Sequence, residues 1–160
     1  GEKTPILHVV GRRGWEAEAV FDLLDRCPSL KSTVVEHTDM SDSALLELVS
    51  GARALLFPSH VEGYGLPLAE ALSSGVPVIA ADIPVFREIA ADIPEYRDPL
   101  DAPGWQEAVL EYAKPASERR SAQLLRLKTY KPYHWKDHFR VVWPYLESVV
   151  QSGPDRTPRR

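Results

Sequence analysis

The stretch that decides the fold is Leu55–Leu72, LLFPSHVEGYGLPLAEAL. It opens with a short apolar run, which predicts a buried strand that Pro58 ends. The glycine-spaced turn Glu62-Gly63-Tyr64-Gly65 follows. Pro67 then stands where a first helical residue belongs, because its missing N–H would be unpaired there anyway. A strand therefore hands over to a helix whose free N–H groups point at the loop, and this geometry binds anions.

Two carboxylates bracket this predicted anion site. Glu62 lies in the loop and Glu70 in about the first turn of the helix. A carboxylate repels phosphate, but it accepts charge-assisted hydrogen bonds from neighbouring hydroxyl groups. A ligand with phosphate in its middle and a diol at each end fits this pattern, and a nucleotide-sugar is such a ligand. The alternative is that Glu70 only complements the helix dipole while Glu62 is solvated.

The motif in this stretch resembles the donor-binding domain of family 4 glycosyltransferases, which are retaining enzymes with the GT-B fold. The resemblance rests on Pro58-Ser59, on the segment Glu62–Pro67, on Glu70-Ala71 and on Gly75–Ile79. The signature of that family is two glutamates with seven residues between them, which is the spacing of Glu62 and Glu70. The resemblance runs from about Ile6 to Pro99 and more loosely to Val150.

The resemblance implies a role for each site residue. Glu62 would lie against the donor sugar and stabilise positive charge at its anomeric carbon, while Glu70 would hold the ribose diol. Thr38 belongs to the loop that contacts the nucleotide base, although the family often has Gly at this position. Pyrophosphate or sugar would meet the backbone N–H groups of Gly63, Tyr64, Gly65 and Leu66. No metal or other cofactor is implied.

The resemblance also implies a donor, an acceptor and a missing part. Short segments of the sequence resemble those of bacterial capsule and lipopolysaccharide mannosyltransferases. We therefore expect a GDP- or UDP-linked hexose and a glycan or lipid-linked acceptor. The chain would begin after the first strand–helix unit of its own domain and would lack the N-terminal acceptor domain. We therefore expect the chain alone to be inactive.

Strand and helix patterns alternate along the first 114 residues with short links. We expect strands at about 5–10, 32–36, 53–57, 76–80 and 94–97, the first of them buried, with helices at 15–26, 42–50, 65–74, 84–91 and 103–113. Such alternation predicts an α/β domain with one parallel sheet covered on both faces, a Rossmann-like fold. Helices at 117–131 and 134–150 would pack on this domain, and 151–160 would be a disordered tail.

The turn after the first strand contains Arg12 and Arg13. In open α/β sheets, ligands bind beyond the carboxyl ends of the strands, where these arginines stand. Arg12 is therefore a candidate phosphate contact, and the alternative is a solvated basic turn. In the C-terminal part, His134 and His138 stand four residues apart, but Trp135 occupies the position where the metalloprotease motif requires Glu.

The composition of the chain indicates which cellular compartment and which partners to expect. The net charge of −4 gives no reason to expect a nucleic-acid partner. A single cysteine, Cys27, fits a reducing compartment, so we expect a cytoplasmic protein. The basic segment 117–131 has two interpretations, a solvated face or an approach to an anionic membrane, which would place the protein at the inner face of the plasma membrane.

Two rival functions remain open at this stage. A sugar-nucleotide epimerase would turn over a nucleotide-sugar without any acceptor. A non-catalytic nucleotide-binding module would show no turnover at all, and a flavodoxin-like interaction module would show no nucleotide affinity. No dinucleotide fingerprint opens the first helix, so a nicotinamide cofactor is not expected.

Overall fold

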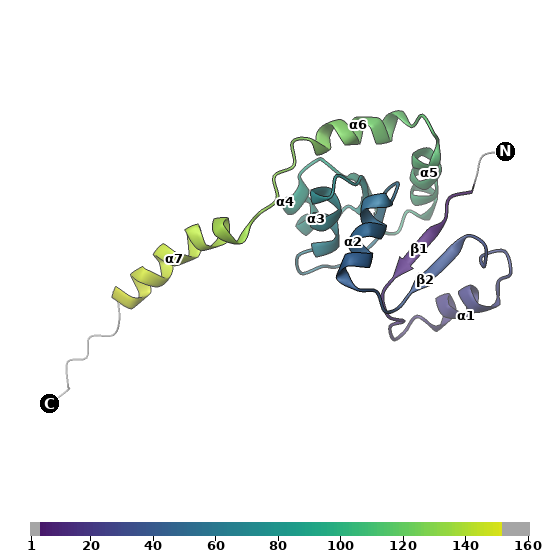
Figure 1. Cartoon of the computed structure of the whole chain (residues 1–160), viewed down its shortest axis with the longest axis horizontal. Coiled ribbons are helices and arrows are strands. Elements are labelled where there is room, and N and C mark those ends of the chain that lie inside the picture. The colour runs from purple at the N-terminus through teal and green to yellow at the C-terminus, as the bar shows by residue number, and fades with distance from the viewer. Residues whose placement is uncertain (1–3, 152–160) are drawn as a thin grey trace. The chain divides into compact units, whose positions relative to one another are not determined.

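The structure is a computed structural model that describes residues 4–151 (Figure 1). The predicted order of strands and helices is confirmed within this range. The elements are β1 (Leu7–Val10), α1 (Glu18–Arg26), β2 (Val34–His37), α2 (Asp42–Gly51), β3 (Leu55–Phe57), α3 (Leu66–Ser73), β4 (Val78–Ala81), α4 (Pro84–Ala90), β5 (Glu95–Arg97), α5 (Ala102–Ala113), α6 (Glu118–Leu127) and α7 (Trp135–Gln151). The expected tail falls outside the described residues except for Gln151, which ends α7.

All strand pairs are parallel, as the alternating pattern predicts, but the strands do not form one sheet. β1 pairs with β2 from Leu7↔Val34 to Val10↔His37, and β3, β4 and β5 form a second sheet in that order. No ladder joins β1 to β3 within residues 4–151. The predicted α/β class with parallel strands and covering helices is confirmed, but the described strands form two parallel sheets and not one.

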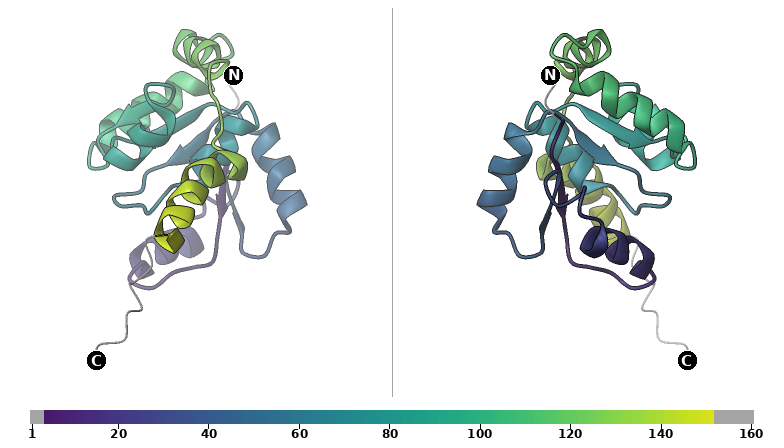
Figure 2. Two further views of the ribbon diagram at one scale, coloured as in Figure 1. Left: turned by 90° about the vertical axis from the view of Figure 1, so that its left-hand side faces the viewer. Right: turned by 90° about the vertical axis from the view of Figure 1, so that its right-hand side faces the viewer.

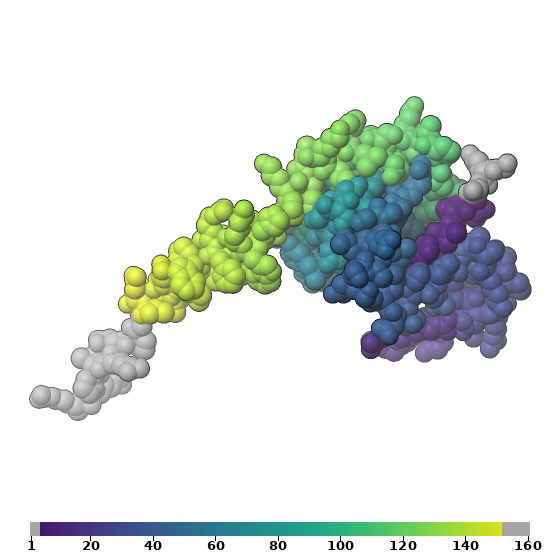
Figure 3. Space-filling view, in the orientation of Figure 1, coloured from purple at the N-terminus to yellow at the C-terminus, as the bar shows by residue number. Residues whose placement is uncertain are grey.

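The first strand is exposed, although its apolar sequence predicts burial. Leu7 retains 43% and Val10 44% of their accessible surface, and the purple atoms of this segment are visible in the space-filling view (Figure 3). The physical reason is pairing: β1 is bonded to β2 alone, and neither core cluster includes any of its residues. An apolar run is therefore buried only where other helices or strands cover it.

The first helix begins at Glu18, three residues later than the sequence predicts. Trp15 is 83% exposed, and Glu16 has a positive φ of 58°. A left-handed residue cannot continue a right-handed helix, so the helical repeat starts after it. The second helix begins as predicted, with the Ser41 side chain accepting a hydrogen bond from the Ala44 N–H at 3.3 Å.

The core lies around the three-stranded sheet, which has helices on both faces (Figure 2). β4 is the central strand and all four of its residues are buried. Ile79 packs on Ala108 and Tyr112 of α5, whereas Val78 and Ala80 belong to the cluster that includes α3 and α4. The change of side from Val78 to Ile79 to Ala80 follows from the two-residue period of a strand, whereas Ala81 also belongs to the cluster with α3 and α4.

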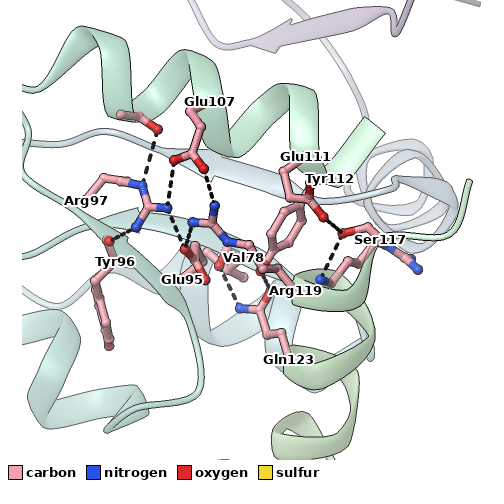
Figure 4. Close-up of polar contacts among 12 residues, drawn as sticks. Val78, Glu95, Tyr96, Arg97, Glu107, Glu111, Tyr112, Ser117, Arg119 and Gln123 are labelled. Atoms are coloured by element: carbon pink, nitrogen blue, oxygen red, sulfur yellow. Dashed lines mark hydrogen bonds and ion pairs between the residues drawn. The ribbon is translucent and has the colours of Figure 1, made fainter. Parts of the chain in front are cut away.

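A polar cluster attaches α6 to this core (Figure 4). Gln123 is fully buried, donates to the Val78 carbonyl at 2.7 Å and accepts from the Tyr112 hydroxyl at 2.8 Å. Burial raises the pKa of Tyr112. Arg119 binds the carboxylates of Glu95 and Glu107. Together with Leu124 and Leu127, which pack in the hydrophobic core cluster, these polar contacts hold the helix.

The interpretation of segment 117–131 as a solvated basic face is wrong for its arginines. Besides Arg119, Arg120 donates to the Arg53 carbonyl at 3.0 Å, and Arg126 donates to the Ile93 carbonyl at 3.2 Å. Among residues 4–151, those up to Tyr130 form one compact unit, and those from Lys131 to the end of α7 form another. The expected packing of α7 on the domain stays a prediction.

Candidate functional site

The site begins where β3 ends. Gly65 is the residue before α3 and has a left-handed backbone with φ of 93°. A Cβ atom at this position would lie 2.6 Å from Cε1 of Phe86, so the turn requires glycine for space as well as for conformation. The Phe86 ring also stacks on Phe57, the last residue of β3, at 5.0 Å between ring centroids. One buried ring thus supports both ends of the loop.

Four successive N–H groups, three in the turn before α3 and one at its first residue, have no acceptor among residues 4–151. The helix begins at Leu66, so Pro67 is its second residue and not its first. The first hydrogen bonds to the Gly65 carbonyl come from Leu68 and Ala69. Within residues 4–151, the N–H groups of 63–66 donate to no backbone or side-chain acceptor, and Gly65 is buried. Unpaired donors at a helix N-terminus favour an anionic ligand.

The two glutamates of the motif flank this helix start in different states. Glu62 is half-buried, and its Oε1 accepts a hydrogen bond of 2.7 Å from the Ser59 hydroxyl. Glu70 is exposed, and its carboxylate forms no ion pair or hydrogen bond within the described residues. Sequence reasoning missed Ser59 as a site residue, and the signal was its place three residues before Glu62. Both carboxylates can therefore accept hydrogen bonds from the hydroxyl groups of a ligand.

The two neighbouring arginines of the turn after β1 differ sharply. Arg13 bridges Asp25 at 2.6 Å and Glu36 at 2.7 Å, and its hydrogen bond lowers the pKa of Asp25. Arg12 is exposed and forms no ion pair within residues 4–151. Of the two, only Arg12 has a guanidinium with no acidic partner among the described residues, and this group could bind a ligand anion. Arg13 instead ties the turn to α1 and β2.

The structure places Arg12 and Thr38 after adjacent parallel strands. Val10 of β1 pairs with His37 of β2, and the Gly11 N–H donates to the His37 carbonyl at 2.9 Å. Thr38 is exposed in the bend that follows β2. No hydrogen bond or ion pair joins these residues to the Glu62 loop within the described part of the chain. The role of Thr38 at a nucleotide base stays a prediction.

Two further features of the described residues bear on the chemistry. Residues 4–151 contain no group of three or more His, Cys, Asp or Glu side chains that could hold a metal ion. His138 lies edge-on to the Trp135 ring, with 5.7 Å between centroids, and so takes part in an aromatic contact within α7. No helix in the same range is long and apolar enough to cross a membrane.

Mannosyltransferases are among the curated relatives of the chain. It is 43% identical over 83 residues to the serotype-specific mannosyltransferase WbdA of Escherichia coli, a match to 52% of this chain and 10% of that protein. It is 30% identical over 128 residues to the O-antigen chain mannosyltransferase B of Escherichia coli, with 79% of this chain and 33% of the relative covered. The chain thus spans a third or less of the length of these relatives.

Solved structures show the same fold at lower identity. A sucrose-phosphate synthase from Thermosynechococcus elongatus matches 92% of this chain and 39% of its own with a TM-score of 0.72 and 21% identity. WaaG, a glycosyltransferase involved in lipopolysaccharide biosynthesis, matches 92% of this chain and 38% of its own with a TM-score of 0.59 and 22% identity. The model of the family "Glycosyl transferases group 1" matches residues 2–93, more than half of the chain. The chain therefore belongs to the group 1 glycosyltransferase family.

Proposed function

We propose that this chain is the donor-binding domain of a retaining hexosyltransferase that transfers mannose from a nucleotide diphosphate sugar to a glycan or lipid-linked acceptor. The observation that carries this proposal is the row of four unpaired N–H groups at residues 63–66, with Glu62 and Glu70 on either side. Family membership supports the transferase chemistry. The relatives named as mannosyltransferases support mannose as the sugar.

Each group has a role that follows from its charge. The N–H groups of 63–66 bind the pyrophosphate or the sugar at the helix N-terminus. Glu70, whose carboxylate has no partner among residues 4–151, accepts hydrogen bonds from the ribose diol. Glu62 accepts hydroxyl groups of the sugar and stabilises the positive charge that develops at the anomeric carbon as the bond to phosphate breaks. Arg12 supplies a counter-charge to the pyrophosphate.

The proposal includes no metal ion and no other cofactor. The helix N-terminus and an arginine can balance the charge of the leaving diphosphate, which is a task that divalent cations perform in other transferases. The base is guanine or uracil, and the N-terminal acceptor domain and the acceptor complete the partners. We place the reaction in the cytoplasm, at the inner face of the plasma membrane, where a lipid-linked acceptor is available.

The test uses the whole protein that carries this chain, incubated with a panel of GDP- and UDP-linked hexoses. Transfer of mannose to a glycan or lipid-linked acceptor, with retained anomeric configuration and in the presence of EDTA, is the expected result. Turnover of a nucleotide-sugar without acceptor would instead identify an epimerase. Binding without turnover would identify a nucleotide-binding module. Activity lost in EDTA and restored by Mg²⁺ or Mn²⁺ would contradict the metal-free mechanism.

A further inference from the structure

The loop that carries Glu62 is fixed at its two ends and nearly free between them. Phe57 precedes it as the last residue of β3, which pairs with the buried Ala80 of β4. Gly65 closes it against the Phe86 ring, which also stacks on Phe57. Between these anchors the side chains of His60, Val61 and Tyr64 are exposed. The position of the Glu62 carboxylate is therefore not set by burial in a core.

One hydrogen bond crosses this loop. The Ser59 hydroxyl donates to Oε1 of Glu62 at 2.7 Å. Within residues 4–151 it is the only hydrogen bond in which any residue from 59 to 64 takes part, since the backbone groups of this segment bond to no other described residue. Ser59 is half-buried and lies two residues after the β3 strand, so the donor sits near the rigid end of the loop.

We propose that Ser59 is a positioning residue for donor-sugar chemistry: its hydroxyl holds Oε1 of Glu62 so that Oε2 faces the reacting sugar. This inference rests on the proposed function, in which Glu62 contacts that sugar. Oε2 forms no hydrogen bond within the described residues, so one oxygen of the carboxylate is anchored and the other is left for the ligand. Because the Ser59 hydroxyl donates its hydrogen to Oε1, the Glu62 carboxylate is the acceptor in this bond.

The bond matters for turnover more than for binding. A carboxylate that stabilises developing charge must be placed before the reaction, because reorganisation during the reaction opposes catalysis. Diphosphate binding depends on the N–H groups of 63–66 and on Glu70, which do not contact Ser59. Loss of the Ser59 hydroxyl should therefore lower kcat, by about tenfold to a hundredfold, since a misplacement of about 1 Å has this order of effect. The dissociation constant of the bare nucleoside diphosphate should stay unchanged.

Three variants of the whole protein test the inference. Ser59→Ala removes the hydroxyl, Ser59→Thr keeps a hydroxyl at the same atom position, and Ser121→Ala is the matched control. The Ser121 hydroxyl of α6 donates at 2.8 Å to the carbonyl of Ser117, the residue that caps this helix, so this control loses a comparable hydrogen bond outside the proposed site. Measured for each are kcat and KM with the nucleotide-sugar, affinity for the bare nucleoside diphosphate by calorimetry, and the melting temperature.

The expected pattern is a low kcat in Ser59→Ala alone, with Ser59→Thr restored toward wild type and with diphosphate affinity and melting temperature unchanged in all three. An unaltered kcat in Ser59→Ala would overturn the inference. So would a Thr variant as slow as the Ala variant, or a loss of diphosphate affinity and melting temperature that accompanies the loss of kcat, since these mark a structural role. Failure of the proposed function is recognised separately, because wild-type protein would then transfer no sugar, and the role of Ser59 would fail with it.

Discussion

The ring of Phe86 fills the space that a side chain on Gly65 would need. A Cβ atom there would lie 2.6 Å from Cε1 and 3.1 Å from Cδ1 of the ring. The backbone of Gly65 also has φ of 93°, a value that residues other than glycine rarely adopt. The start of α3, and with it the row of unpaired N–H groups, therefore depends on a contact between two elements that are separate in the sequence.

We predict that Gly65→Ala lowers the free energy of unfolding by about 1–3 kcal/mol, because a left-handed alanine is strained and Phe86 must shift in a packed core. Gly63→Ala is the matched control. Gly63 has no atom within 4 Å of its Cβ position, and its φ is not positive. Denaturant unfolding of both variants is the measurement. Equal stability of the two variants would show that the ring contact does not constrain the turn.

The polar cluster at α6 makes a second prediction on stability. Gln123→Ala leaves the Tyr112 hydroxyl and the Val78 carbonyl without their partner inside a buried site. Removal of one partner of a buried pair costs about 1–3 kcal/mol, so we expect a loss of unfolding free energy in this range. Ser121→Ala on the exposed side of the same helix should cause little change. If both variants unfold alike, the buried hydrogen bonds of Gln123 contribute nothing to stability.

We predict that the protein loses stability at alkaline pH because of Tyr96. Burial raises the pKa of Tyr96 from 10.0 to about 12, and its hydroxyl donates to the carbonyls of Phe86 at 3.0 Å and Ala91 at 2.8 Å. Because the folded pKa lies above the unfolded one, this contribution to stability is complete below pH 10 and is lost as pH rises from 10 to 12. Tyr96→Phe should be less stable at neutral pH but should lose less between pH 10 and pH 12. Parallel pH profiles of the two proteins would contradict the assignment.

Much of the local structure could be predicted from the sequence because it depends on short-range patterns. The glycine after α3, Gly75, has the positive φ of 77° that a helix stop favours, and α2 begins at its predicted first residue with Ser41 as its cap. The exposure of β1 could not be predicted, since burial depends on which elements cover a strand. The hydrogen bond from Ser59 to Glu62 also escaped prediction, because it depends on the path of a loop that has no periodic pattern.

The adjacent residues Arg12 and Arg13 also show what the sequence alone could not predict, and they lead to a further prediction. The sequence does not distinguish Arg12 from Arg13, but the structure pairs only Arg13 with Asp25 and Glu36. In the whole protein, Arg12→Ala should weaken nucleoside diphosphate binding by about tenfold and reduce its salt dependence. Arg13→Ala should instead lower the melting temperature and leave affinity unchanged. Calorimetric titration at two salt concentrations measures both, and an affinity loss confined to Arg13→Ala would reverse the assignment.

The last prediction separates the two glutamates of the motif. Glu70 is exposed and unpaired within the described residues, and it is proposed to hold the ribose diol, which is present in the bare nucleoside diphosphate and in the nucleotide-sugar alike. Glu70→Ala should therefore weaken both ligands by about tenfold to a hundredfold, because a charged acceptor is lost. Glu62→Gln should leave diphosphate affinity nearly unchanged and lower turnover, since the contact of Glu62 strengthens as positive charge develops at the sugar.

If Glu70 only complements the helix dipole, its replacement would lower stability by about 0.3–1 kcal/mol and leave ligand affinity intact. Calorimetric titration of both variants of the whole protein with the diphosphate and with the nucleotide-sugar distinguishes these cases. The comparison needs both ligands, because a general loss of folding would weaken them equally in both variants and would also lower the melting temperature. Equal effects of the two substitutions on the bare diphosphate, at an unchanged melting temperature, would mean that the sugar and ribose ends of the ligand are assigned to the wrong glutamates.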